Sequence, residues 1–138
     1  CLWDKKYKDG IADDYFSTRW FISRYCFLSG KSEIKGVKDI VKLNDTYTQQ
    51  VFQEFSNNLA EFMKPYISDF KADLLLIGGN ITKSHQLFLP KVLELWKNNG
   101  IEIPVTIIQN SEEANLIGAS YLFNEKFWEK IKDELPAL

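Results

Sequence analysis

The chain has 138 residues, of which 45% are hydrophobic and 26% are charged, and this composition predicts a single soluble globular domain. Its net charge of −2 gives no electrostatic signature of nucleic-acid binding, and no apolar run approaches the length of a membrane-spanning helix. The two cysteines, Cys1 and Cys26, and the single histidine, His85, are too few for a zinc site. We expect reduced thiols and, because the first residue is not methionine, a segment of a longer protein.

The first thirty residues are predicted to form an arm followed by a helix. Residues 1–11 are polar and aromatic with a turn signal at Asp9-Gly10, so we expect an irregular, solvated arm. Asp13-Asp14 precedes a helical apolar pattern and suits the positive end of a helix better than it suits a metal pair. The helix should end at Gly30, which can serve as its C-cap.

Two further helices are predicted before the middle of the chain. A short one covers residues 36–43. A long one covers residues 46–67, where apolar residues recur at steps of three and four. Asn44 or Asp45 should cap the long helix at its start. Pro65 lies near its other end, so the helix should either kink there or stop earlier.

The second half of the chain alternates strands and helices. Residues 72–77 form a continuous apolar run, which is typical of a strand buried on both faces of a parallel sheet. The pattern then predicts a helix over 84–99, a strand over 104–108, a helix with Ser111 as its N-cap, and a final amphipathic helix over 127–135. The short connections predict parallel strands with a right-handed crossover. Two strands are too few for a stable sheet, which indicates a truncated domain or a sheet completed by other residues.

The pair Gly78-Gly79 at the end of the first strand has two interpretations. Open α/β sheets bind ligands at the carboxyl ends of their strands, where residues without a Cβ let a phosphate or ribose approach the backbone. Alternatively, the pair is a tight turn that requires a positive φ, and the local pattern alone favours this turn. The spacings of the Rossmann and P-loop motifs are absent, which excludes those two kinds of nucleotide site.

The remaining candidate functional residues are better explained by structural roles. Glu112 and Glu113 are expected to stabilise a helix start, and Gly118-Ala119 should let that helix pack closely on the sheet or on the glycine turn. His85 is expected to be a solvated polar residue at a helix start rather than a catalytic one. No catalytic triad can be assembled around a single histidine.

Three segments carry a resemblance to a known family. "ADLLLIGGNITKSHQLFLPKVLELW" resembles a strand, glycine turn and helix of the ROK family of sugar kinases and sugar-responsive repressors. "IPVTIIQNSEEANLIGASYLF" resembles the next strand and helix of that family, and "DDYFSTRWFISRY" is similar to the helix after its sugar-binding region. The resemblance covers roughly residues 10–125 and is most specific at the glycine turn.

The ROK family belongs to the actin-like ATPase superfamily, so the resemblance implies an α/β fold. It would be a partial RNase H-like domain, with short parallel strands packed with several helices. In that superfamily the glycine pair contacts the ribose and α-phosphate of ATP, which implies a cofactor-binding role for Gly78, Gly79 and Asn80. Many relatives have glycine where this chain has Asn80, whose side chain could donate to the nucleotide instead. The family's phosphate loop, catalytic aspartate and cysteine-rich zinc motif are not found in this sequence.

The resemblance implies a cytoplasmic kinase that uses ATP and Mg to phosphorylate a hexose, as a glucokinase does. This segment alone would be inactive, the sugar would bind through the other half of the parent protein, and a homodimer is expected. No contact of this segment with a membrane or with nucleic acid is expected. Two alternatives stay open: a sugar-responsive regulator or interaction module, and a plain α/β scaffold whose glycines only form a turn.

Residues 1–138 would be one C-terminal ATPase-like segment, with an arm (1–11), a helical part (12–71), a strand–helix–strand–helix part (72–123) and a C-terminal helix (124–138).

Overall fold

The computed structural model describes residues 1–108 and 110–131. Helices dominate, and the structure is a mostly helical α/β arrangement with one short parallel strand pair. The elements in chain order are β1 (Lys6–Tyr7), β2 (Gly10–Ile11), α1 (Ala12–Phe16), α2 (Thr18–Ser29), α3 (Val37–Leu43), α4 (Thr46–Phe70), β3 (Leu75–Ile77), the 3-10 helix η1 (Asn80–Ser84), α5 (His85–Asn98), β4 (Val105–Ile107), α6 (Ser111–Ser120), the 3-10 helix η2 (Tyr121–Phe123) and α7 (Glu125–Ile131).

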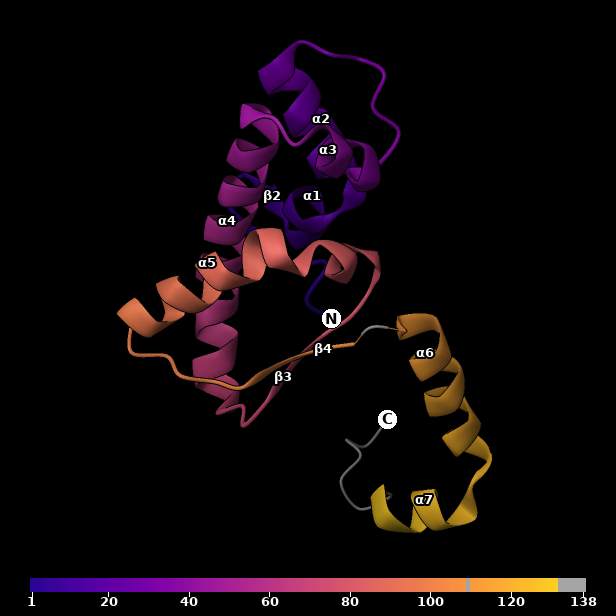
Figure 1. Ribbon diagram of the computed structural model, residues 1–138. Helices are drawn as coiled ribbons and strands as arrows, with labels where there is room; N and C mark the ends of the chain where they lie inside the picture. Colours follow the sequence, from indigo (N-terminus) through magenta and orange to yellow (C-terminus); the bar gives the residue numbers. More distant parts are fainter. Residues whose placement is uncertain (109, 132–138) are drawn as a thin grey trace.

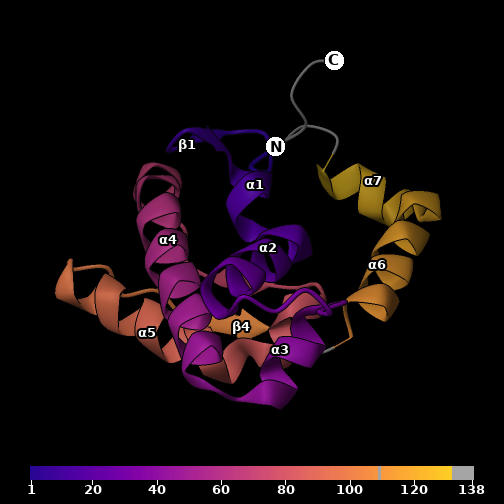
Figure 2. The same cartoon turned by 90° about the horizontal axis from the view of Figure 1, so that it is seen from above.

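The other helices of the body and the parallel strands are arranged along helix α4. Figure 1 shows α5 crossing α4, with α1, α2 and α3 near the upper part of α4 and the strands β3 and β4 near its lower part. Viewed from above in Figure 2, α6 and α7 lie apart from this helical body. The main core is apolar and joins α2, α3, α4 and α5; its most deeply buried side chains are Phe21, Tyr25, Ile40, Val51, Phe52, Phe88 and Val92.

Part of the N-terminal arm forms a short hairpin and buries Tyr7, so the predicted loop is wrong there, whereas Lys5, Lys6 and Lys8 are exposed as expected of a solvated arm. Strands β1 and β2 pair antiparallel around the turn at Lys8 and Asp9. The ring of Tyr7 is only 8% exposed and packs against Phe16 and Phe62. Alternation over so few residues cannot reveal such a hairpin, because its burial depends on a ring of α4 that lies 55 positions away in the chain (62 − 7 = 55).

The first predicted helix is interrupted at Ser17, where the backbone is extended. The break separates α1 from α2, and the Ser17 side chain accepts a hydrogen bond from the Trp20 backbone N–H, so that it caps α2. At the other end of α2, Gly30 adopts the left-handed conformation with φ of 70°, and its predicted role as C-cap is confirmed.

Helix α3 lies where the sequence predicts it, and Asp45 is the N-cap of α4. The Asp45 carboxylate accepts a hydrogen bond of 2.9 Å from the Thr48 backbone N–H. Helix α4 continues through Pro65 to Phe70, so the alternative of an earlier stop is wrong. Burial of Ile67 beyond the proline ties the last turns to the core and offsets the lost backbone hydrogen bond.

Strands β3 and β4 pair in parallel, as predicted, with Leu75 opposite Val105. Both of these residues face the helices and pack against the main core. The expected burial on both faces is wrong, because Leu76 is 56% exposed and Leu74 is 49% exposed. The second face of this strand pair is therefore open among the described residues.

Helix α6 begins after Asn110, whose side chain accepts from the Glu113 backbone N–H and makes Asn110, not Ser111, the N-cap. The expected close packing at Gly118-Ala119 is also wrong, because both residues are exposed and a Cβ added to Gly118 would meet open space. The sequence therefore predicts helix α6, but it does not predict that Gly118 and Ala119 are exposed. Residues 132–135 of the predicted final helix lie outside the described part of the chain.

Candidate functional site

The glycine turn lies between β3 and η1, at the carboxyl end of the parallel strand. Gly79 has φ of 89° and ψ of 175°, a backbone region that is essentially restricted to glycine. The need for a positive φ is therefore confirmed at Gly79. A Cβ added there would meet nothing within 4 Å, so the α-carbon of Gly79 faces open space that a ligand can approach.

The buried side chain of Thr82 stabilises this turn by a hydrogen bond. Its side chain is buried, with an exposed fraction of 3%, and its hydroxyl donates a hydrogen bond of 2.7 Å to the Gly79 carbonyl. The same oxygen lies 3.4 Å from the Ile108 carbonyl at the end of β4. Thr82 thus couples the glycine turn to the end of the neighbouring strand. The sequence analysis missed this residue, although a hydroxyl three positions after a glycine turn is a recognisable turn-capping signal.

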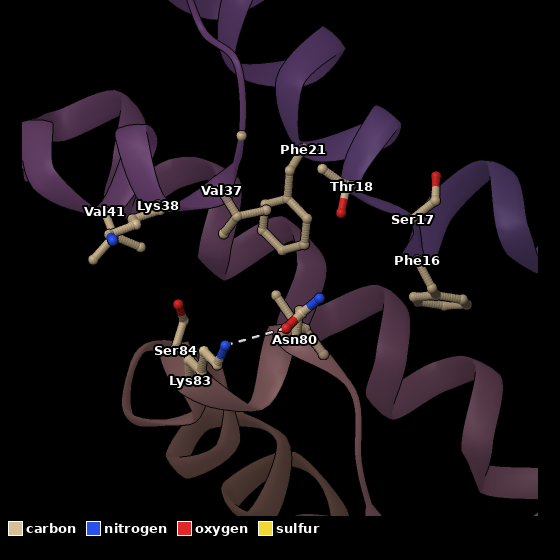
Figure 3. Close-up of a pocket in the computed structure, with 12 residues that line it drawn as sticks. Phe16, Ser17, Thr18, Phe21, Val37, Lys38, Val41, Asn80, Lys83 and Ser84 are labelled. Atoms are coloured by element: carbon tan, nitrogen blue, oxygen red, sulfur yellow. Dashed lines mark hydrogen bonds between the residues drawn. The ribbon is translucent and has the colours of Figure 1, made fainter. Parts of the chain in front are cut away.

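A cavity of about 760 Å³ opens beside this turn, between η1, the junction of α1 with α2, and the start of α3. Figure 3 shows Asn80, Lys83 and Ser84 on one side of it, with Phe21 and Val37 opposite them. The size lies within the range of about 300–1,000 Å³ that is common for small-molecule sites. The lining residues are Phe16, Ser17, Thr18, Phe21, Gly36, Val37, Lys38, Val41, Asn80, Ile81, Lys83 and Ser84.

The lining combines an apolar part with a cationic one. Aromatic and aliphatic side chains from α1, α2, α3 and η1 supply the apolar wall. Lys38 and Lys83 add two positive charges, and no aspartate or glutamate among the described residues lines the cavity. The first residue of α2, Thr18, also lies at the wall, where a helix N-terminus favours negative charge. This combination suits a ligand with a flat apolar group and an anionic group.

Asn80 has a defined orientation in this wall. The Nζ of Lys83 donates a hydrogen bond of 3.2 Å to the Asn80 Oδ1, drawn as a dashed line in Figure 3. With its carbonyl oxygen engaged, Asn80 keeps its amide N–H groups as donors. Donors of this kind match the oxygen acceptors of a phosphate or a ribose.

Of the three predicted cofactor-binding residues only Asn80 lines this cavity, whereas Gly78 and Gly79 precede it in the turn, and His85, Asp13 and Asp14 lie elsewhere. The His85 Nδ1 is 2.8 Å from the Thr82 carbonyl, so the ring is half-buried against the end of η1. Asp14 accepts a hydrogen bond from the Ile11 backbone N–H, which confirms its role at a helix start. Asp13 pairs with Arg19 at 2.5 Å.

Glu113 bonds to the Asn110 side chain at the start of α6, as a capping residue does, whereas the side chain of Glu112 lies outside the described part. Within residues 1–108 and 110–131 no helix is long and apolar enough to cross a bilayer.

Residues 9–126 match the ROK family. The chain belongs to the ROK family. No significant match to the chain was found among curated proteins or among solved structures. The match begins after β1, covers β2, the helical body and both strands of the parallel pair, and includes every residue that lines the cavity. The fold is consistent with part of an actin-like domain of this ROK protein.

Proposed function

We propose that this ROK chain is the nucleotide-binding, C-terminal segment of a cytoplasmic sugar kinase, and that the cavity beside its glycine turn binds ATP. Gly78, Gly79 and Asn80 would contact the ribose and the α-phosphate. The observation that carries the proposal is the composition of the cavity wall at Asn80, with Lys38 and Lys83 as cations and no carboxylate among the lining residues.

The apolar wall supports a position for the adenine. The side chains of Phe16, Phe21, Val37, Val41 and Ile81 line the cavity from three helices and from η1. A purine ring placed among them would remove apolar surface from water on both of its faces. Because a Cβ added to Gly79 would meet nothing within 4 Å, the sugar-phosphate part could approach its α-carbon closely.

The donor set of this cavity does not fit a magnesium site. Magnesium in kinases is held by one or two carboxylates together with substrate phosphates, and the described residues that line this cavity include no carboxylate. In the described residues no group of three His, Cys, Asp or Glu side chains is placed to hold a metal ion. The magnesium that serves kinases of this family would therefore have its protein ligands outside this cavity.

Nucleotide binding is tested by titrating the 138-residue chain with ATP, ADP and adenosine while backbone amide signals are followed by NMR. We expect saturable shifts at Gly79, Asn80 and Val37, with ATP and ADP binding more tightly than adenosine because of the two lysines. Val41→Trp, which fills the cavity from α3, should abolish the response. Absence of any shift at these amides with millimolar ATP would refute the proposal.

A second function, a sugar-responsive regulator or non-catalytic module, accounts equally well for one observation, the lack of a catalytic group at the cavity. Phosphoryl transfer needs a group that orients the attacking hydroxyl, and within the described part of the chain no Asp, Glu or His lines the cavity. The chain alone is therefore expected to bind nucleotide without turnover. A coupled assay of ADP release with glucose present tests this point, and robust glucose-dependent turnover by the isolated chain would contradict it.

A further inference from the structure

The cavity beside the glycine turn carries positive charge that no described carboxylate offsets. Lys38 and Lys83 both line it, and among residues 1–108 and 110–131 neither lysine forms an ion pair with an Asp or Glu. The Lys83 Nζ donates instead to the neutral Asn80 side chain, at 3.2 Å. The wall therefore favours an anion whose negative charge is not already neutralised by a bound cation.

The carboxylates on the helices that form this wall are engaged away from the cavity. On α3, the Asp39 carboxylate accepts a hydrogen bond of 3.1 Å from the Lys35 backbone N–H. On α1, Asp13 pairs with Arg19, and Asp14 accepts from the backbone N–H of the residue before the helix. None of these three carboxylates lines the cavity. Contacts at the helix starts thus keep the acidic side chains of α1 and α3 out of the wall.

The other polar side chains of the wall are neutral. With its carbonyl oxygen bonded to Lys83, Asn80 presents N–H donors, and Thr18 and Ser84 present uncharged hydroxyls. Magnesium needs oxygen ligands, and a protein that binds it together with phosphates normally supplies one or two carboxylates. A nucleotide that enters with magnesium would bring a cation towards two lysines and would gain no carboxylate ligand for it.

We propose that this cavity takes nucleoside di- and triphosphates as their magnesium-free anions, and that magnesium weakens their binding. A divalent cation on the phosphates cancels much of the charge that attracts Lys38 and Lys83. The inference rests on the nucleotide site proposed above, and it adds to that proposal the ionic form in which the ligand binds.

The test is a calorimetric titration of the full 138-residue chain with ATP, once with EDTA and once with excess MgCl2, at equal ionic strength set with NaCl. We expect the Kd to be about fivefold higher with magnesium. Adenosine, which has no phosphate to hold the metal, should show the same Kd in both buffers. An equal or lower Kd for ATP with magnesium would overturn this inference and leave the nucleotide site standing. No binding of ATP in either buffer would refute the nucleotide site and the inference together.

Lys38→Met tests whether the lysines cause the effect of magnesium. The ratio of the two Kd values should fall to about twofold, because one of the two charges that attract the free anion is lost. Lys126→Met, at an exposed lysine on α7, is the matched control and should keep the native ratio. An undiminished ratio in Lys38→Met, with an unchanged unfolding temperature, would contradict the proposed cause.

Asn80→Asp supplies the type of ligand that the wall lacks. The new carboxylate would stand beside the phosphates, where magnesium can bridge the two anionic groups. Magnesium should therefore lower the Kd of this variant for ATP, which is the opposite of its effect on the native chain. Weakening by magnesium to the native extent in Asn80→Asp would show that the missing carboxylate is not the reason, and would overturn the inference.

Discussion

The hydroxyl of Tyr25 donates a hydrogen bond of 2.6 Å to the carboxylate of Asp45, and this contact ties the end of α2 to the cap of α4. Tyr25 is fully buried at its ring, whereas the Asp45 side chain keeps partial contact with solvent. The bond from Tyr25, followed by the bond from the Thr48 backbone, lowers the pKa of Asp45 from 3.8 to about 2. Folding therefore favours the ionised form of this carboxylate.

This contact predicts a pH dependence of stability. The unfolded chain binds a proton at Asp45 more readily than the folded chain does, so the ionised carboxylate stabilises the fold above about pH 4. That contribution should disappear as the pH falls from about 4 to about 2. Asp45→Asn keeps the cap but loses the charge, so its urea midpoint should be lower than that of the native chain at pH 7, and the difference should vanish across this window. The exposed Asp73→Asn is the control, and a difference that stays constant down to pH 2 would contradict the prediction.

Asn80 allows a charge test of the proposed nucleotide site. Asn80→Asp places an anion in the cavity wall next to Lys83, where it would repel phosphate and compete for the lysine. The Kd for ATP should rise by about tenfold, equivalent to about 1.4 kcal/mol. Asn80→Gly, which removes the side chain without adding a charge, should retain binding. Calorimetry checks both values, and equal affinities for the Asp variant and the native chain would argue against contact between Asn80 and the nucleotide.

Lys38 should contribute to phosphate binding and not to binding of the base. It is an exposed residue of α3 at the cavity wall, so Lys38→Met removes a charge while keeping much of the aliphatic stem. We expect the Kd for ATP to rise by about fivefold, and the Kd for adenosine to stay the same. Added salt should weaken ATP binding to the native chain more than to this variant. A parallel loss of adenosine affinity would indicate a structural effect instead.

Two glycines should respond in opposite directions to alanine. Gly79→Ala forces a side chain into a backbone region reserved for glycine, and the free energy of unfolding should fall by about 1–3 kcal/mol. Gly118 lies in the exposed middle of α6 with open space around it, so Gly118→Ala should favour the helix by about 0.5–1 kcal/mol. Chemical denaturation measures the first change, and helicity from circular dichroism at raised temperature measures the second. A neutral Gly79→Ala would show that the turn relaxes without cost.

Two phenylalanines of α4 test how much burial in the main core contributes to stability. Phe55 of α4 is 3% exposed and contacts the rings of Phe21 and Phe88, whereas Phe70 at the end of α4 is 84% exposed. Phe55→Ala should lower the free energy of unfolding by about 3–5 kcal/mol through lost burial and a residual cavity. Phe70→Ala should change it by less than about 0.5 kcal/mol. Similar losses in the two variants would mean that burial does not control stability here.

Part of the structure follows directly from local patterns in the chain. The three- and four-residue spacing of apolar side chains places α4, and a polar residue before that pattern gives its cap at Asp45. Gly30 ends α2 and Gly79 ends the strand turn because each residue adopts a positive φ, a local property that sequence expresses well. The glycine pair Gly78-Gly79 after an apolar run likewise predicts the turn, whereas the candidate role of Asn80 came from the resemblance to the ROK family.

What sequence alone determined about this protein is its α/β character, its ROK membership and the position of the glycine turn. These depend on short-range spacing and on residues that adjoin one another along the chain. Only the tertiary structure decided that Tyr7 is buried, that α1 and α2 separate at Ser17, and that Lys38 lies across a cavity from Asn80. The reason is physical: burial, ion pairing and cavity walls arise from contacts between elements far apart in the chain, and no local period encodes which of them meet.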